Sequence, residues 1–203
     1  LDPEKSWNEE ITWCLKDAKE ALPFLHELSI TFFHSMVRDW IRWVPGPDDP
    51  YMWTPQNVQK VRAAGLESRA GLRMETRKMD LYGNISYSFT RSVNENKDES
   101  TYRMQLPYVA EHTGMINAGI GYGHFSFNYT QSFTGERSTV ADHSETLPPF
   151  SIGRIRIGYG WNLKKCLLDF HFRIDNLFDV EYQMVQYYPN PGISFTGGVN
   201  LKM

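Results

Sequence analysis

Residues 125–134 read FSFNYTQSFT, and their side chains alternate between two kinds. Phe125, Phe127, Tyr129 and Phe133 occupy odd positions, where Gln131 is the single polar residue, and small polar residues occupy every even position. Successive side chains of a β-strand point to opposite faces of a sheet. The stretch therefore predicts a strand with one aromatic face and one wet face.

The same alternation recurs along most of the chain. It predicts nine strands over residues 7–16, 28–43, 57–74, 78–92, 108–121, 125–134, 150–161, 166–175 and 193–203. Their lengths are typical of strands that cross a membrane, which need ~9–11 residues. The pattern indicates an all-β, antiparallel up-and-down meander that forms part of a transmembrane β-barrel, with lipid on one face and a polar lumen on the other. A soluble β-sandwich, in which aromatic faces pack on each other, alternates in the same way.

The predicted connections alternate in length along the chain. Residues 17–26, 75–77, 122–124 and 162–165 are the short connections, and residues 44–56, 93–107, 135–149 and 176–192 are the long ones. In a meander, alternate connections lie on opposite rims, so one rim carries the tight turns and the other the long loops. Membrane barrels have short periplasmic turns and longer extracellular loops. The asymmetry therefore favours the barrel over the sandwich.

Composition narrows the function classes. The 203 residues carry a net charge of −3, which does not favour nucleic-acid binding through a basic surface. Mean hydropathy is −0.48, which is compatible with a barrel because only alternate residues of its strands face lipid. Cys14 and Cys166 lack metal-ligand spacing. Neither a Gly-x-Ser-x-Gly nucleophile elbow nor another catalytic set is present, so we expect no enzyme activity.

An odd number of strands indicates a larger assembly. Single-chain bacterial barrels contain even numbers of strands, from 8 upward, and the first and last strands predicted here would both be open edges. We therefore expect residues 1–203 to form the C-terminal portion of a barrel whose other strands lie further toward the N-terminus.

Charged residues at period two are the candidates for the polar face. The arginines are Arg69, Arg73, Arg154, Arg156 and Arg173, which would line the lumen of a barrel or the solvent face of a sandwich. Asp169, His171 and Asp175 share this pattern, but consecutive positions lie ~6.6 Å apart and mix signs, which favours a ladder of charges over a metal site. Asp142, His143 and Glu145 in a long loop indicate either calcium binding or a solvated loop.

Aromatic residues near the long loops have two interpretations. Trp40 and Trp43 lie at a predicted strand end, where we expect girdle residues of a membrane interface. Aromatic side chains at loop tips can instead stack on a ligand. The candidate ligand contacts are Tyr51, Trp53, Tyr182, Tyr187 and Tyr188, although packing within the last loop is an equal explanation for the last three.

Short motifs spread over the chain resemble those of TonB-dependent outer-membrane receptors. The C-terminal part reads Asp175-Asn176-Leu177-Phe178-Asp179, then Tyr182, Tyr188-Pro189-Asn190-Pro191-Gly192 and a final alternating strand. Leu1-Asp2-Pro3-Glu4-Lys5-Ser6, Gly65-Leu66-Glu67, and Tyr108 with His112 are similar to further motifs of that family. Ile193, Ala110 and Met203 depart from it, at positions where the family typically has Arg, Pro and a terminal aromatic residue.

The resemblance implies a 22-stranded barrel with an N-terminal plug, in the outer membrane of a Gram-negative bacterium. About nine C-terminal strands would lie in this chain, and the plug and TonB contacts would belong to the N-terminal part that is absent from it. The five arginines would then face the plug. The implied function is uptake of a scarce large ligand, an iron–siderophore complex or cobalamin, without a cofactor.

Two observations bear on the choice of ligand and class. Ile41-Arg42-Trp43, followed by Pro45, Trp53, Pro55 and Asn57, is similar to cobalamin-receptor-like barrels. A non-transporting structural or adhesive barrel and a soluble sandwich that acts as a binding module remain as alternatives.

Overall fold

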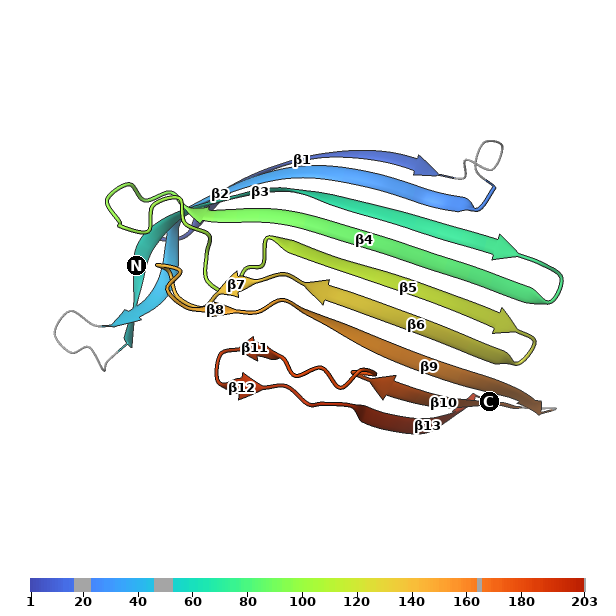
Figure 1. Ribbon diagram of the computed structural model, residues 1–203. Coiled ribbons are helices and arrows are strands. Elements are labelled where there is room, and N and C mark those ends of the chain that lie inside the picture. The colour runs from blue at the N-terminus through green and yellow to red at the C-terminus, as the bar shows by residue number, and fades with distance from the viewer. Residues whose placement is uncertain (17–22, 46–52, 164–165, 203) are drawn as a thin grey trace.

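The structure is a computed structural model, and it describes residues 1–16, 23–45, 53–163 and 166–202. Nine strands form one antiparallel sheet in chain order, as the sequence predicts (Figure 1). They are β1 (Lys5–Lys16), β2 (Leu25–Pro45), β3 (Trp53–Glu75), β4 (Met79–Asn94), β5 (His112–Tyr122), β6 (Phe125–Thr134), β9 (Phe150–Leu163), β10 (Cys166–Asp175) and β13 (Ser194–Lys202). No helix of the described residues is long and apolar enough to cross a membrane.

Two short ladders lie within the long loops, and the sequence did not predict them. β7 (Arg137–Ser138) pairs with β8 (Thr146–Leu147), and β11 (Gln183–Val185) pairs with β12 (Tyr188–Pro189). They fold the loops between β6 and β9 and between β10 and β13 into small hairpins, so these loops have defined structure of their own.

The hairpin of β2 and β3 extends further than predicted. Residues 44–56 were expected to be a long loop, but the ladder continues through Trp43↔Pro55 and Val44↔Thr54 to Pro45↔Trp53. Aromatic and β-branched residues at 40–44 favour strand, and this preference prevails over the prolines. At β5 the strand begins at His112 instead of residue 108, because Tyr108 has a φ of 62° and cannot continue an extended strand.

The register keeps the two faces separate from β3 to β13. Residues that pair from strand to strand lie on the same face, and one apolar row consists of Leu72, Gly83, Ala118, Tyr129, Ile155, Ile174 and Phe195. The row beside it consists of Arg73, Tyr82, Gly119, Asn128, Arg156, Arg173 and Thr196. We call these two surfaces of the sheet the apolar face and the polar face.

The apolar face is open in this structure. Phe125 is 59% exposed and Ile116 is 50% exposed, and the described residues form no second large sheet that could cover them. In a sandwich these side chains would be buried between two sheets. The sandwich interpretation is therefore wrong, and the exposed apolar face fits the wall of a membrane barrel.

Among the connections that the structure describes, those at the two rims differ in length as predicted. Thr76 N donates to Met79 O over 2.8 Å in the tight turn between β3 and β4, and Gly123 adopts a φ of +58° between β5 and β6. The opposite rim carries the described loops 95–111, 135–149 and 176–193. In Figure 1 these loops gather at the end of the sheet that also holds the N-terminus.

A bulge changes the direction of Trp40. Val37 pairs with Val61 and Trp40 pairs with Gln59, so β2 inserts one extra residue beside Asp39, whose φ is 60°. Trp40 therefore lies on the polar face and borders a hollow with Leu106, Tyr108 and Val140. The prediction that Trp40 belongs to a membrane girdle is wrong for this reason. The side chain of Trp43 lies outside the described part of the chain.

Candidate functional site

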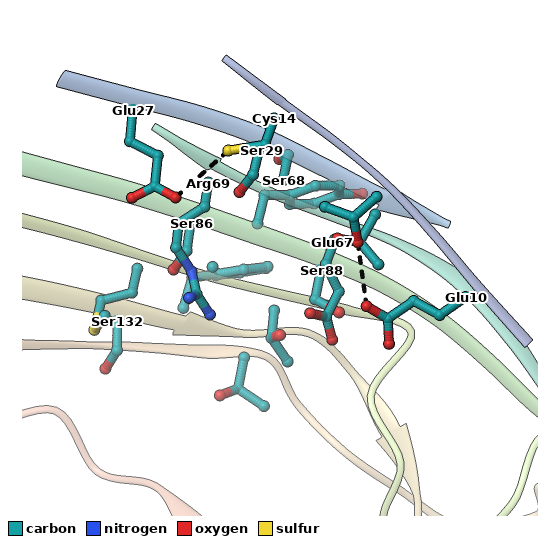
Figure 2. Close-up of a pocket in the computed structure, with 18 of the residues that line it drawn as sticks. Glu10, Cys14, Glu27, Ser29, Glu67, Ser68, Arg69, Ser86, Ser88 and Ser132 are labelled. Atoms are coloured by element: carbon teal, nitrogen blue, oxygen red, sulfur yellow. Dashed lines mark hydrogen bonds between the residues drawn. The ribbon is translucent and has the colours of Figure 1, made fainter. Parts of the chain in front are cut away.

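The polar face of β1–β6 borders an open hollow of about 750 Å³. Most of its lining residues are polar or charged, with Tyr87, Met115 and Phe133 as the large exceptions. Figure 2 labels Glu10, Cys14, Glu27, Ser29, Glu67, Arg69, Ser86, Ser88 and Ser132 around it. Thr12 and Thr31 meet across β1 and β2, with 2.9 Å between their hydroxyl oxygens. Every second residue of each strand reaches this surface, so the hollow follows directly from the alternation in the sequence.

Arg69 and Arg73 lie on this polar face but are not neighbours. Arg69 borders the hollow between Ser29 and Ser86, its partners on the adjacent strands. Arg73 lies at the rim of tight turns, where its Nη2 is 2.6 Å from Glu75 Oε1 and 3.3 Å from Asp80 Oδ2. All three side chains of this network are about half exposed, so the ion pairs contribute little to stability.

The other three predicted arginines gather on β9 and β10. Asp175 accepts a hydrogen bond from Arg154 through one oxygen and forms an ion pair with Arg173 through the other, over 2.7 Å. Arg156 lies directly opposite Arg173 in the register. Two guanidinium groups thus contact one carboxylate and a third arginine lies beside them in the sheet, so the cluster carries excess positive charge.

A network of amides and hydroxyls continues from the arginine cluster across the polar face. Asn117 Nδ2 donates to Thr130 Oγ1 over 2.8 Å and to Asn128 Oδ1 over 3.1 Å. Asn128 Nδ2 donates to Tyr82 Oη over 3.3 Å. The Tyr82 ring lies over Gly119 so closely that a Cβ there would be 2.1 Å from Cζ. Glycine therefore permits a large aromatic ring to lie flat on the polar face.

Two of the predicted loop tyrosines border a second hollow. It has a volume of about 790 Å³, between the loop 176–193 and the residues Leu147 and Pro148, and both Tyr182 and Tyr187 line it. A hollow of that size fits a small-molecule site, for which ~300–1,000 Å³ is common. Tyr188 is 71% exposed and does not line it. Tyr51 and the side chain of Trp53 lie outside the described residues.

Arg137 joins the two loops beside this hollow, and no pattern in the sequence singles it out. It is 4% exposed, its guanidinium lies 5.0 Å from the Phe150 ring centre, and Nη2 donates to Gln183 O. Tyr182 packs on the same ring, with 4.7 Å between ring centroids. Burial lowers the pKa of Arg137 below its ordinary value, with Tyr108 acting in the opposite direction. Arg137, Phe150 and Tyr182 are distant in sequence, so their contact can be recognised only in the folded structure.

The acidic loop segment does not converge on a common centre. Asp142 Oδ1 accepts hydrogen bonds from the backbone and hydroxyl of Ser144, and these bonds lower the pKa of Asp142. His143 Nε2 bonds Gln105 O, and Glu145 accepts from Gln186. Within the described ranges, no group of three His, Cys, Asp or Glu side chains is arranged to hold a metal ion.

Comparison with known proteins agrees with this architecture. The family model described as "TonB dependent receptor-like, beta-barrel" matches residues 1–177. Among solved structures, the unliganded ferric citrate transporter FecA is similar with a TM-score of 0.75 at 18% identity, over 95% of this chain and 30% of that one. The ferric preacinetobactin receptor BauA from Acinetobacter baumannii gives 0.73 at 12% identity, over 99% and 30%.

A third similar structure is that of a transporter named for a different cargo. The copper transporter OprC gives a TM-score of 0.71 at 16% identity, over 98% of this chain and 31% of that one. The chain therefore spans about a third of the length of the structures it matches. At these identities the structures show the fold alone, whereas the family model covers most of the chain. The chain belongs to the TonB-dependent receptor-like β-barrel family, whose members are outer-membrane receptors for transport.

Proposed function

We propose that these residues form a barrel segment of an outer-membrane receptor that imports a scarce large ligand in a Gram-negative bacterium. The observation that carries the proposal is the two-faced sheet, which has an exposed apolar face, a charged polar face and, among the connections that the structure describes, its long loops at one rim. Membership of the receptor family supports it. The plug, the TonB contact and the remaining strands would belong to receptor segments outside residues 1–203.

For the ligand, we propose an anionic ferric chelate of the siderophore or citrate type. Several similar structures bear names of ferric receptors, and the excess positive charge around Asp175 suits negatively charged cargo. Cobalamin is the alternative, which the motif around Ile41-Arg42-Trp43 favours. That the ligand is a ferric chelate and not cobalamin stays a prediction.

The roles of individual residues follow from their positions. Tyr182 and Tyr187 would contact ligand in the loop hollow, because aromatic rings that line it can pack on a ligand. Tyr51, Trp53 and Tyr188 are proposed as further ligand contacts. Arg69, Arg73, Arg154, Arg156 and Arg173 would face the plug from the polar face.

Uptake by cells that carry the full-length receptor tests the proposal. We expect import of iron-55 bound to a ferric chelate, dependent on TonB, and no import of radiolabelled cobalamin. Import of cobalamin alone would replace the proposed ligand but retain the transporter. Correct insertion of the receptor with no import of any chelate or cobalamin would favour the structural or adhesive barrel.

Substitutions test the residue roles within the same assay. Tyr182→Ala with Tyr187→Ala should weaken ligand binding by tenfold or more, and Tyr188→Ala, which changes a ring outside the hollow, should have a smaller effect. Charge reversal at Arg154, Arg156 and Arg173 should impair uptake or plug retention. Unchanged uptake and unchanged plug retention would contradict the plug-facing assignment.

A further inference from the structure

Basic side chains gather on the apolar face at the end of the sheet that carries the long loops. They are Lys5 of β1, Arg38 of β2, Lys60 and Arg62 of β3, and Arg91 of β4, which we call the outer basic patch. Each lies an even number of residues from an apolar-face side chain on its own strand: Ile11, Phe32, Leu66 and Phe89. Alternation therefore directs the patch to the same face as the membrane-facing residues.

The register brings these five residues into one neighbourhood. Lys5 lies directly opposite Arg38, Arg62 opposite Met36, and Arg91 opposite Ala64. Lys60 is two residues from Arg62 on β3 and its carbonyl accepts from Glu95 N. With strands ~4.8 Å apart and same-face neighbours ~6.7 Å apart, the five Cα atoms lie within roughly 20 Å of one another.

Acidic groups neutralise only part of this charge. Arg62 Nε contacts Glu95 Oε1 at 2.7 Å, and Glu9 contacts His34 Nδ1 at 3.6 Å. Glu4, at the start of β1, accepts from the backbone of Ile41. Lys5, Arg38, Lys60 and Arg91 are exposed and form no ion pair with another described residue. Opposed Lys5 and Arg38 would repel each other, which costs stability unless an anion lies between them.

The height of the patch on the wall matches a membrane surface. From Leu15 near the tight turns to Lys5, β1 spans ~33 Å, or about 25 Å along the membrane normal at a strand tilt of about 40°. This is the height of the apolar band of a typical barrel, ~25 Å. Trp7 lies beside the patch, 67% exposed, with its indole donating to Glu9 over 2.9 Å, as expected for an aromatic residue at the interface.

We propose that the outer basic patch binds an anionic, phosphate-bearing lipid headgroup of the outer leaflet. Guanidinium and ammonium groups are the side chains that recognise phosphate, and basic clusters beside an apolar band attract anionic headgroups. Continuity with the exposed apolar face selects a lipid over a soluble anion, since the acyl chains would cover Ile11 and Phe32 below the patch. This inference rests on the membrane orientation in the proposed function.

Native mass spectrometry of the full-length, delipidated receptor tests the inference. Phosphatidylglycerol and phosphatidylcholine would be titrated separately onto the unmodified receptor, an Arg38→Gln/Lys60→Gln/Arg91→Gln variant and a control variant, Arg77→Gln/Lys78→Gln/Lys97→Gln. The control removes equal charge from a tight turn and a loop tip. Each basic residue contributes about fivefold to anionic-lipid binding, so the patch variant should bind phosphatidylglycerol at least tenfold more weakly, whereas the control should not.

Three results would overturn the inference: equal losses in both variants, equal binding of both lipids by the unmodified receptor, or complete competition by millimolar inorganic phosphate. Heat-dependent mobility on gels verifies that each variant is folded. Ligand uptake provides an independent readout. Loss of lipid binding with normal uptake supports the patch, and failure of uptake with normal lipid binding counts against the proposed transporter alone.

Discussion

The wall of strands and the cluster of long loops differ in side-chain burial and in the interactions that stabilise them. Along the wall, most large apolar side chains are half-buried or exposed, and Ile116, Phe125 and Trp161 are each at least 50% exposed. The most buried residues lie instead in or beside the loops, where Asn94 is 2% exposed and Arg137 is 4% exposed. The wall therefore depends on its ladder of backbone hydrogen bonds and on the surrounding medium, while the loops contain a small core of their own.

This difference has a chemical counterpart. Side-chain hydrogen bonds in the loops often end on backbone atoms, as for Asn176 Nδ2 with Val180 O at 2.9 Å and Ser92 N with Gln105 Oε1 at 2.9 Å. On the polar face of the wall they link side chains of adjacent strands, as in the Asn117–Asn128 pair. Loops that lack regular ladders must satisfy buried backbone groups with side chains. Changes in the two regions should therefore have different consequences.

The largest expected effect comes from charging the apolar face. Ile116→Arg should destabilise the receptor by about 2–4 kcal/mol, the cost of an arginine on the lipid face near the bilayer midplane. Met115→Arg is the matched control, since Met115 is the adjacent residue, is 44% exposed and borders the hollow on the polar face. Denaturant unfolding in liposomes measures both variants. Equal effects would mean that the two faces do not meet different media.

A smaller and local effect is expected from the loop core. Arg137→Met should cost about 1–3 kcal/mol, because the carbonyl of Gln183 is left unsatisfied. Hydrogen exchange should rise in residues 135–149 and 176–193 and stay unchanged in β3–β6. Arg137→Lys serves as the comparison, as it retains the charge and loses the planar group on Phe150. Faster exchange throughout the wall would show that loops and wall are one cooperative unit.

Within the wall, Gly119→Ala should have a modest effect of about 1–2 kcal/mol from overpacking. The added Cβ would meet the Tyr82 ring at 2.1 Å, and the ring would have to swing away from Asn128. Combining the change with Tyr82→Ala removes the clash, so the double variant should lose less than the sum of the single variants. Strict additivity in denaturant unfolding would rule out this contact.

The smallest effect concerns the exposed turn at Asp142. Its pKa is lowered in the native loop, so the carboxylate supports the turn fully above its ordinary pKa, and that support disappears as pH falls through the lower native value. Ser144 N donates to Asp142 Oδ1 over 3.1 Å, so its protection factor, the exchange rate corrected for the intrinsic pH dependence of amide exchange, should fall in acid. Asp142→Asn should abolish this pH dependence, and a persistent dependence would assign it to another group.

Much of the wall could be predicted because apolar and polar side chains alternate along each of its strands. Alternation at residues 125–134 and in eight other stretches identified every strand of the large sheet, and the loop asymmetry agreed with the turns that the structure describes. Arg154 and Arg156 were placed on the polar face by the same period, beside Ile155 on the apolar face. The medium at each face of the sheet determines which residue types are found there. The local sequence therefore contains the information on which face each side chain lies.

The rest depends on contacts between segments that are distant in sequence. The bulge at Asp39 turns Trp40 to the polar face, although Trp40 reads as a girdle residue in sequence. Arg137 resembles any surface arginine until the Phe150 ring and the Gln183 carbonyl meet it. Alternation describes a residue's own strand and contains no information on which loop will cover it.

Phe150 lies between the guanidinium of Arg137 and the ring of Tyr182, and these belong to two different loops. An outward swing of either loop would break its contact with Phe150 and the hydrogen bond from Arg137 Nη2 to Gln183 O. If ligand displaces the loop 176–193, the hairpin of β7 and β8 should move with it, because Arg137 is bonded to Gln183. The two loops of this rim would then move together.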